Sequence, residues 1–195
     1  RARDSSIYNR LADIEWDTPI GEIAASGGIA MIRASAFQAV EGFNPAIIAA
    51  EDDELCLRIR RLGWKVLRTE AEMASHDMAM TRFRQWWKRS VRTGHAFAEG
   101  VARHGRSPDR HFVGQFRSLM LWGIALPTIA LALAWPTRGA SLLLFLGYPW
   151  LFLRIYQYSR RRELSRADSR LFAAACVIGK FSQALGAIQY WLGRL

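Results

Sequence analysis

The stretch that decides the fold of this chain is EDDELCLRIRRLG, residues 51–63. Leu55, Ile59 and Leu62 fall on one face at helical spacing, and the final glycine is a residue that commonly ends helices. The sequence therefore predicts a helix from about residue 52 to 62. The four acids at its beginning have a simple structural explanation, because carboxylates favour the positive end of a helix dipole by about 0.3–1 kcal/mol each. Their charge alone does not make the run a functional site.

The residues on either side of this run favour an α/β domain. The apolar run Ile29-Ala30-Met31-Ile32 follows two glycines and predicts a buried strand, and residues 64–67 predict another. Residues 34–40 have a helix-forming composition, and Gly42-Phe43-Asn44-Pro45 is typical of a turn. The order strand, helix, helix, strand is that of the second half of an α/β domain.

Aromatic and basic residues are interleaved from Thr81 to about Gly100. This pattern predicts an amphipathic helix that lies on a membrane surface. A helix that faces a protein core shows the same pattern and remains the alternative. The interleaved residues are Phe83, Trp86, Trp87, Val91 and Phe97 among Arg82, Arg84, Lys88, Arg89 and Arg92.

Apolar segments make up most of the remaining chain. Residues 119–135 and 141–153, the second extendable to 158, are joined by a short link and predict a membrane-spanning helical hairpin, with Pro127 as a kink. A third segment, 171–192, carries a lysine and two glutamines, so it either packs against the hairpin or lies in the membrane interface.

The formal net charge of +10 is concentrated next to these apolar segments. The excess of arginine and lysine lies in residues 82–117 and 154–170, which is typical of a cytoplasmic membrane flank rather than a nucleic-acid groove. A solvated basic face remains the alternative. The positive-inside rule then places both ends of the hairpin on the cytoplasmic side.

The two cysteines, Cys56 and Cys176, lack the spacing of metal ligands and lie in different settings. We expect both to be buried thiols in a reducing compartment. Because the chain begins with Arg1 inside sequence of folded character, we also expect that an N-terminal part is missing.

Taken in order, the segment from about Ser26 to Gly94 resembles the family 2 glycosyltransferases. Two positions depart from the family pattern: Glu41 replaces the first glycine of a Gly-Gly-Phe turn, and Glu54 replaces an aspartate. The positions that match are Gly27, Gly28, Ile29 to Arg33, Gly42-Phe43-Asn44, Glu51-Asp52-Asp53-Glu54-Leu55, Arg58 and Gly63-Trp64.

The resemblance implies an α/β fold, the second half of a glycosyltransferase A-type domain that binds a nucleotide-diphospho-sugar. Residues 1–78 would be the C-terminal part of the catalytic domain, and residues 79–117 an amphipathic interfacial segment. Residues 118–195 would form a membrane region of two to three transmembrane helices, at about 118–135, 140–158 and 171–192.

The resemblance also implies a mechanism, in which a carboxylate takes the proton from an acceptor hydroxyl while that oxygen attacks the sugar. By position, Asp52 is the expected catalytic base and Glu51 the backup or orienting group. Asp53 and Glu54 are expected to be structural, and Glu54 is spaced to form a salt bridge with Arg58 one turn later.

A divalent metal, Mg²⁺ or Mn²⁺, is implied for the leaving diphosphate. No Asp-x-Asp motif follows an apolar strand in this chain, so we expect the metal to be bound mainly by the missing N-terminal half. His76 lies where some related enzymes place a histidine near the metal, although a lone histidine is more often structural.

Five further residues are candidates for substrate binding. Gln85, Lys88 and Arg89 resemble the Gln-x-x-Arg-Trp motif of processive polysaccharide synthases, but the lysine and arginine replace its last two residues. A membrane-surface helix that faces lipid phosphates explains the same residues equally well. Gly27 and Gly28 allow close approach of the backbone to a sugar, and a tight turn is the alternative.

The function that follows is a membrane-bound, inverting glycosyltransferase. It would move a sugar from a nucleotide-diphosphate donor to a lipid-linked, cell-envelope or polysaccharide acceptor. We expect a multi-pass protein of the cytoplasmic (inner) membrane, with the catalytic domain on the cytoplasmic side and no nucleic-acid partner. A non-catalytic membrane scaffold that retains the fold is the alternative, and a basic nucleic-acid-binding module is disfavoured by the apolar segments.

Overall fold

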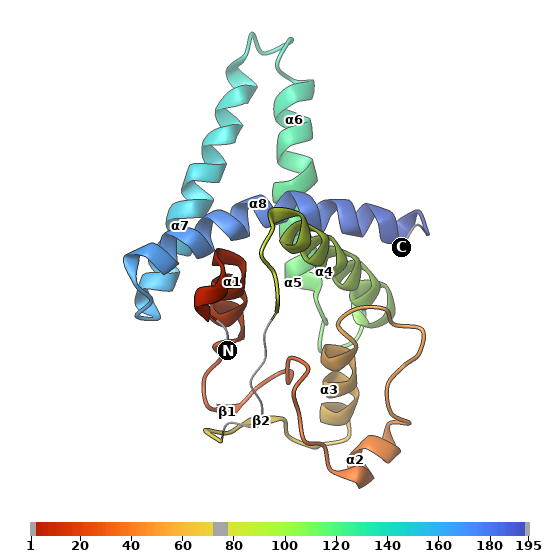
Figure 1. Ribbon diagram of the computed structural model, residues 1–195. Coiled ribbons are helices and arrows are strands. Elements are labelled where there is room, and N and C mark those ends of the chain that lie inside the picture. Colours follow the sequence, from red (N-terminus) through yellow and green to blue (C-terminus); the bar gives the residue numbers. More distant parts are fainter. Residues whose placement is uncertain (1–2, 72–77, 194–195) are drawn as a thin grey trace. The chain divides into compact units, whose positions relative to one another are not determined.

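The computed structural model describes residues 3–71 and 78–193 of the 195-residue chain. The chain divides into two compact units, Arg1–Thr81 and Arg82–Leu195. Figure 1 shows that most of the described chain is helical and that its two short strands lie in the first unit.

The first unit consists of helices and a small two-stranded sheet. The strands are antiparallel, with Gly21 opposite Arg68 and Glu22 opposite Leu67. The backbone N–H of Ile23 extends the pairing by donating to the carbonyl of Val66 at 2.9 Å. In chain order the elements are the 3-10 turn Arg3–Ser5, α1 (Ile7–Trp16), β1 (Gly21–Glu22), α2 (Ala34–Ala39), α3 (Glu51–Arg61) and β2 (Leu67–Arg68).

Helix α1 begins with a side-chain cap and is tied to the end of the unit. Ser6 accepts a hydrogen bond from the N–H of Asn9 at 3.0 Å, as an N-cap serine does. Asn9 in turn accepts from the backbone N–H of Met80 at 3.1 Å, and the Ser6 hydroxyl donates to the carbonyl of Met80. Leu11 and Ile14 are buried on the other turns of the helix, so α1 supplies part of the core of this unit.

The helices predicted at residues 34–40 and 52–62 are confirmed as α2 and α3. The buried strand predicted at Ile29–Ile32 is wrong, because these residues form no strand and Met31 is 89% exposed. A strand requires a partner for its backbone groups, and the described residues offer none to this run. The strand predicted at 64–67 lies slightly later, at Leu67–Arg68.

The turn between α2 and α3 contains two successive residues in the left-handed region. Glu41 has φ +58° and Gly42 has φ +70°. Only glycine adopts this region without cost, and another residue loses roughly 1–2 kcal/mol there. Glu41 therefore stands at a position that favours glycine, the residue that the resembled family has there. The cost of this departure is local backbone strain.

We expect Glu41→Gly to raise the free energy of unfolding of the protein by about 0.5–1 kcal/mol. The substitution relieves the left-handed strain, and the greater freedom of glycine in the unfolded chain offsets part of the gain. Thermal or denaturant unfolding of the two proteins measures the difference. The matched control is Gln38→Gly in the exposed part of α2, where glycine should destabilise. A Glu41→Gly protein that is less stable than the parent would contradict the assigned backbone conformation.

Within residues 82–193 the second unit consists of helices joined by turns and loops, and it contains no strand. Helices cover the ranges that the apolar segments predicted, although their bounds differ by several residues. The elements are α4 (Phe83–His104), α5 (Val113–Met120), the π-helical η2 (Leu121–Ala125), α6 (Leu126–Ala132), the 3-10 helix η3 (Ala140–Leu146), α7 (Gly147–Arg161) and α8 (Arg166–Trp191).

Two antiparallel arms form a hairpin in this unit (Figure 1). One arm runs through α5, η2 and α6, and the other through η3 and α7. Next to Pro127, where a kink was predicted, the helix contains a π-helical turn: Leu126 donates its N–H to the carbonyl of Leu121, and Pro127, which has no N–H, follows directly. Ser141 fastens the arms near the tip by donating to the carbonyl of Ala130 at 2.7 Å.

Helices α4 and α8 cross with their backbones in contact. A Cβ added to Gly94 would lie 1.9 Å from the carbonyl oxygen of Gln183, and one added to Gly186 would lie 1.8 Å from that of Val91. The hydroxyl of Ser182 donates to that of Ser90 at 2.7 Å within the same contact. Small residues on both helices thus permit the close approach that is common where helices pack in membranes.

The helix predicted to lie on a membrane surface, α4, packs its apolar face against α8. Trp86, which we expected among lipids, is 6% exposed and lies beside Gly179 of α8. Arg84, Lys88 and Arg92 are exposed along α4. The alternative of a core-facing helix therefore accounts for the apolar face of α4, and contact of its basic residues with a membrane remains a prediction.

Two helices of the described chain are long and apolar enough to cross a membrane, Val113–Ala132 and Arg166–Trp191. Both lie in the second unit. They give weak support to membrane association.

Candidate active site

The acidic run forms the first turn of α3, as the sequence predicted. Glu51 is exposed, Asp52 and Asp53 are half-buried, and Glu54 is 4% exposed. Ala50 precedes them in the left-handed region with φ +58° and provides no side-chain cap. The four carboxylates at one helix end therefore occupy different environments.

Glu54 belongs to the structural part of this helix. Both of its oxygens accept from Nε of Arg58 at 2.9 Å, and Arg58 Nη2 lies 2.8 Å from Glu54 Oε2. The same guanidinium donates to the carbonyl of Val40 and, at 2.8 Å, to that of Gly42. The predicted Glu54–Arg58 salt bridge is confirmed, and it also fastens α3 to the turn after α2.

Asp52 lies against the glycine loop that the sequence singled out. Gly27 and Gly28 both have positive φ, +69° and +96°. A Cβ added to Gly28 would lie 3.2 Å from Oδ2 of Asp52, which is tighter than an ordinary contact. Thus the loop brings two predicted site residues together, Gly28 and Asp52, although they are far apart in the sequence.

Burial and mutual repulsion raise the proton affinity of the two central acids. The pKa of Asp52 lies above its usual value because of burial first and the nearby Glu51 carboxylate second. For Asp53 burial, followed by Asp52 and Glu51, raises the pKa to about 6. Carboxylates that retain protons near neutral pH are common in catalytic sites, where neighbours shift the pKa values of groups that transfer protons.

We expect Asp53→Asn to stabilise the protein near neutral pH. An acid whose pKa is raised in the folded state makes folding less favourable as the pH rises from about 4 to about 6, and the cost is constant above that window. Asparagine has no charge to desolvate, so the variant should gain about 2 kcal/mol over the parent at pH 7.5 and little at pH 3.5. Unfolding free energies measured at several pH values give this difference.

The control for that experiment is Asp17→Asn, which alters an exposed carboxylate of the same unit. Because this carboxylate is largely exposed, its replacement should change the stability at pH 7.5 by much less than Asp53→Asn does. If Asp53→Asn instead loses stability relative to the parent as the pH rises, the raised pKa of Asp53 is wrong.

An open hollow of about 1380 Å³ lies beside the glycine loop in the first unit. Gly27, residues 29–33 and Trp64 line it, and the guanidinium of Arg33 lies 5.8 Å from the centroid of the Trp64 ring. Arg68 also lines it, but its guanidinium donates hydrogen bonds to Trp16, Asp17 and Thr18 at the end of α1. An aromatic ring with an exposed cation suits an anionic ligand that carries an apolar or sugar face.

The remaining predicted residues lie elsewhere. Gln85, Lys88 and Arg89 are on α4 of the second unit, where the side-chain oxygen of Gln85 accepts from the N–H of Arg82 at 2.9 Å and caps the helix. Lys88 is exposed and Arg89 half-buried. His76 lies outside the described residues.

The implied divalent metal finds no complete set of ligands in the described chain. Mg²⁺ and Mn²⁺ favour oxygen ligands, and Glu51 and Asp52 supply carboxylates. Within residues 3–71 and 78–193, however, no three histidines, cysteines, aspartates or glutamates lie close enough together to hold an ion. These residues therefore do not fit a metal centre by themselves.

The half-buried acids beside a glycine loop define a site of the kind used for proton transfer by carboxylates. Residues 5–82 match a family model described as the N-terminal domain of galactosyltransferase. The match supports a glycosyltransferase domain in this stretch, and it covers α1 to β2 with the whole acidic run. The match does not point to family 2 specifically. No curated protein and no solved structure matches the chain.

Sequence reasoning did not single out two features of this site. Asp53 was expected to be structural, yet its pKa is shifted to about 6, the larger of the two departures in the run. Ala50 holds a left-handed conformation immediately before the acids, which no residue pattern indicated. Burial is the larger cause of the Asp53 shift and the adjacent acids are the smaller one, and only the adjacent acids were visible in the sequence.

Proposed function

We propose that the protein is a membrane-bound, inverting glycosyltransferase with Asp52 as its catalytic base. The observation that carries the proposal is the half-buried Asp52 carboxylate, held against Gly28 within a glycosyltransferase domain. The donor would be a nucleotide-diphosphate sugar, and the acceptor a lipid-linked, cell-envelope or polysaccharide hydroxyl. The two long apolar helices and the basic segments beside them support a location at a membrane.

The proposed reaction is a single displacement at the anomeric carbon. Asp52 accepts the proton from the acceptor hydroxyl as that oxygen bonds to the carbon. The bond to the nucleotide diphosphate breaks on the opposite face, and the leaving oxygen takes the electron pair, so the configuration inverts. Burial raises the pKa of the base, and repulsion from Glu51, the exposed neighbour that would orient Asp52, raises it further.

Within this proposal the cations of α4 have a positioning role. Lys88 and Arg89, with Gln85 at the helix start, would contact the anionic diphosphate or lipid phosphates near the acceptor. A divalent cofactor, Mg²⁺ or Mn²⁺, is part of the proposal, with most of its ligands outside the described residues. The localisation proposed is a multi-pass protein of the cytoplasmic membrane with its glycosyltransferase domain on the cytoplasmic side.

The test is an assay of sugar transfer with the full-length protein in membranes. A panel of labelled nucleotide-diphosphate sugars and a membrane lipid extract supply donors and acceptors, and release of nucleotide diphosphate is measured together with the labelled product. We expect transfer that depends on acceptor, with an inverted product linkage. A folded protein that transfers no sugar from any donor would favour the non-catalytic scaffold.

A further inference from the structure

Helix α8 has two faces of opposite character. Gly179, Ser182 and Gly186 are buried on the side that meets α4. An apolar stripe runs along the same part of the helix at spacings of three and four residues, which places its members on one face. The stripe consists of Ile178, Phe181, Leu185 and Ile188, each between 39% and 43% exposed.

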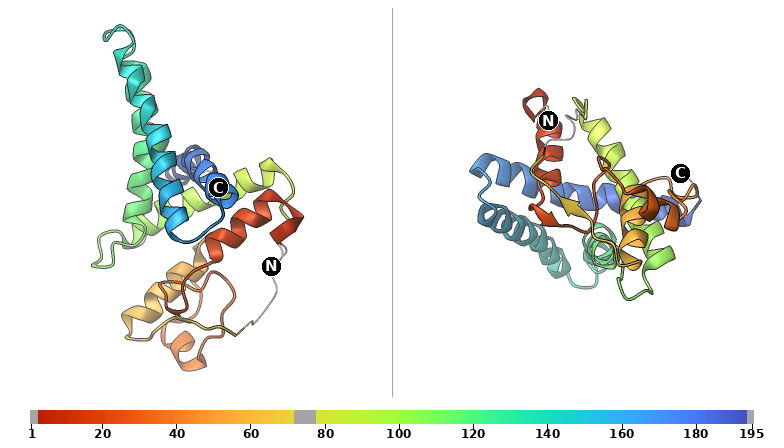
Figure 2. Two further views of the ribbon diagram at one scale, coloured as in Figure 1. Left: turned by 90° about the vertical axis from the view of Figure 1, so that its left-hand side faces the viewer. Right: turned by 90° about the horizontal axis from the view of Figure 1, so that it is seen from below.

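This helix lies across the base of the hairpin. A Cβ added to Gly123 in the first arm would lie 2.4 Å from the carbonyl oxygen of Lys180, so the two backbones touch there. In the second arm the ring of Tyr148 lies 5.6 Å from that of Phe181. Figure 1 shows α8 at a steep angle to α6 and α7, and the left view of Figure 2 shows α8 nearly end-on while the hairpin extends away from it.

The crossing restricts how this unit can enter a bilayer. Two helices at a steep angle cannot both follow the membrane normal. The first arm of the hairpin meets α8 at Gly123. From there to Trp135, twelve residues later, it extends roughly 18 Å at 1.5 Å per residue, which exceeds the hydrocarbon depth of one leaflet, about 15 Å. A hairpin that enters the bilayer therefore leaves α8 parallel to the membrane surface, with its stripe beside the hairpin base.

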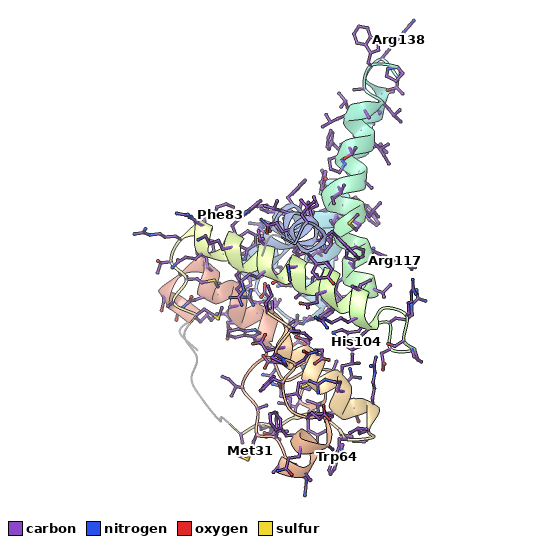
Figure 3. The ribbon with its side chains drawn as sticks, turned by 90° about the vertical axis from the view of Figure 1, so that its right-hand side faces the viewer. Met31, Trp64, Phe83, His104, Arg117 and Arg138 are labelled. Carbon is purple, nitrogen blue, oxygen red and sulfur yellow. The ribbon has the colours of Figure 1, made fainter. Side chains whose placement is uncertain are left out.

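The positive charge of this unit gathers at the base of the hairpin, the end that would face the membrane surface. Residues 154–170, which include the turn between α7 and α8, carry six arginines against Glu163 and Asp168. The guanidinium carbon of Arg154 lies over the ring of Trp150, 5.5 Å from its centroid. Such an arrangement is suited to the headgroup region of a membrane. Figure 3 shows Arg138 at the far tip of the hairpin, away from Arg117 near its base. The base is thus the basic end, and anionic lipid headgroups complement it.

We propose that α8 does not cross the membrane but lies in the surface of an anionic bilayer, with the stripe Ile178, Phe181, Leu185 and Ile188 in the acyl chains. Only the hairpin penetrates deeply, and α4 lies on the aqueous side of α8. The inference rests on the membrane association in the proposed function. It assigns α8, which by length and composition is able to span a bilayer, to a different partner: the lipid surface.

The experiment measures the depth of single spin labels in the full-length protein. Cys56 and Cys176 are first replaced by serine and alanine, and the protein is reconstituted in vesicles of phosphatidylcholine and phosphatidylglycerol. Cysteines introduced at Ile178 and Ile188 carry the labels on α8, with Leu131 in the hairpin as the deep control and Ala102 of α4 as the aqueous control. We expect equal, shallow depths at Ile178 and Ile188, whereas a spanning α8 would separate them by about 15 Å along the normal.

A second measurement, of the side from which cysteines are accessible, tests the same inference if one spin label disturbs the fold. In sealed vesicles, a membrane-impermeant maleimide should react from the same side with cysteines at Ser107, before the hairpin, and at Gly193, after α8. Labelling from opposite sides, or a depth difference near 15 Å, overturns the inference and leaves the membrane association intact. Aqueous depths at all four positions overturn both, and neither measurement depends on sugar transfer.

Discussion

Asp52→Asn should reduce sugar transfer by about 10²–10⁴-fold, the usual contribution of a general base, without unfolding the protein. Asparagine has nearly the same shape as aspartate but cannot accept a proton at neutral pH. Because burial and the Glu51 carboxylate both disfavour the charged form of Asp52, removal of its charge should leave the stability unchanged or slightly higher. The rate at saturating donor and acceptor, together with the unfolding transition, separates the two effects.

The pH dependence of transfer gives a further check on the same residue. The base acts when it is deprotonated, so the rate should rise as the pH passes through the pKa of Asp52, which burial and Glu51 raise above 3.8. Glu51→Gln removes the repulsion and should move this rise to lower pH. If the rate of the parent protein does not rise with pH above 3.8, Asp52 is not the catalytic base.

The controls for Asp52→Asn are chosen by environment. Glu22→Gln alters an exposed carboxylate that pairs with Lys65 at 2.9 Å, and it should transfer sugar at the parental rate. If the folded Asp52→Asn protein retains more than a tenth of the parental rate, another group is the base. Asp53, whose pKa is about 6, would then be the first residue to examine.

The sequence predicted the helices better than the strands, for a physical reason. Helix α3 and its Glu54–Arg58 pair follow from contacts between residues one turn apart, which periodicity reveals directly. A strand at Ile29–Ile32 would need hydrogen-bond partners from other segments, and the composition of the run does not show whether such partners are present. The apolar character of the run was real, but its pairing was not.

The same distinction applies to the candidate site and to α4. The acidic run was recognised from its order along the chain, whereas the approach of Gly28 to Asp52 depends on how the loop folds back, and spacing does not encode that. Trp86 was assigned to lipid, yet α8 covers it, because an apolar face is equally suited to a bilayer and to another helix. Sequence patterns identify such a face without identifying its partner.

Gly186→Ala should destabilise the second unit by more than about 3 kcal/mol, at the upper end of the range for overpacking. The new methyl group would lie 1.8 Å from the carbonyl oxygen of Val91 and 2.8 Å from the N–H nitrogen of His95. Both obstacles are backbone atoms within α4, so no side-chain rotation relieves the overlap. The helices have to separate, which also stretches the hydrogen bond between Ser182 and Ser90. Thermal unfolding of the full-length protein in detergent measures the loss.

Gly179→Ala is the matched control, since it places the same methyl group on the same helix less than two turns away. Its nearest neighbour would be the hydroxyl of Ser90 at 3.6 Å, an ordinary contact. Alanine also favours a helix over glycine by about 1 kcal/mol, so this variant should be as stable as the parent or more so. Equal unfolding temperatures for Gly186→Ala and the parent would mean that α4 and α8 do not touch at this point. A loss confined to Gly186→Ala would instead show that the crossing is set by the absence of a single side-chain carbon.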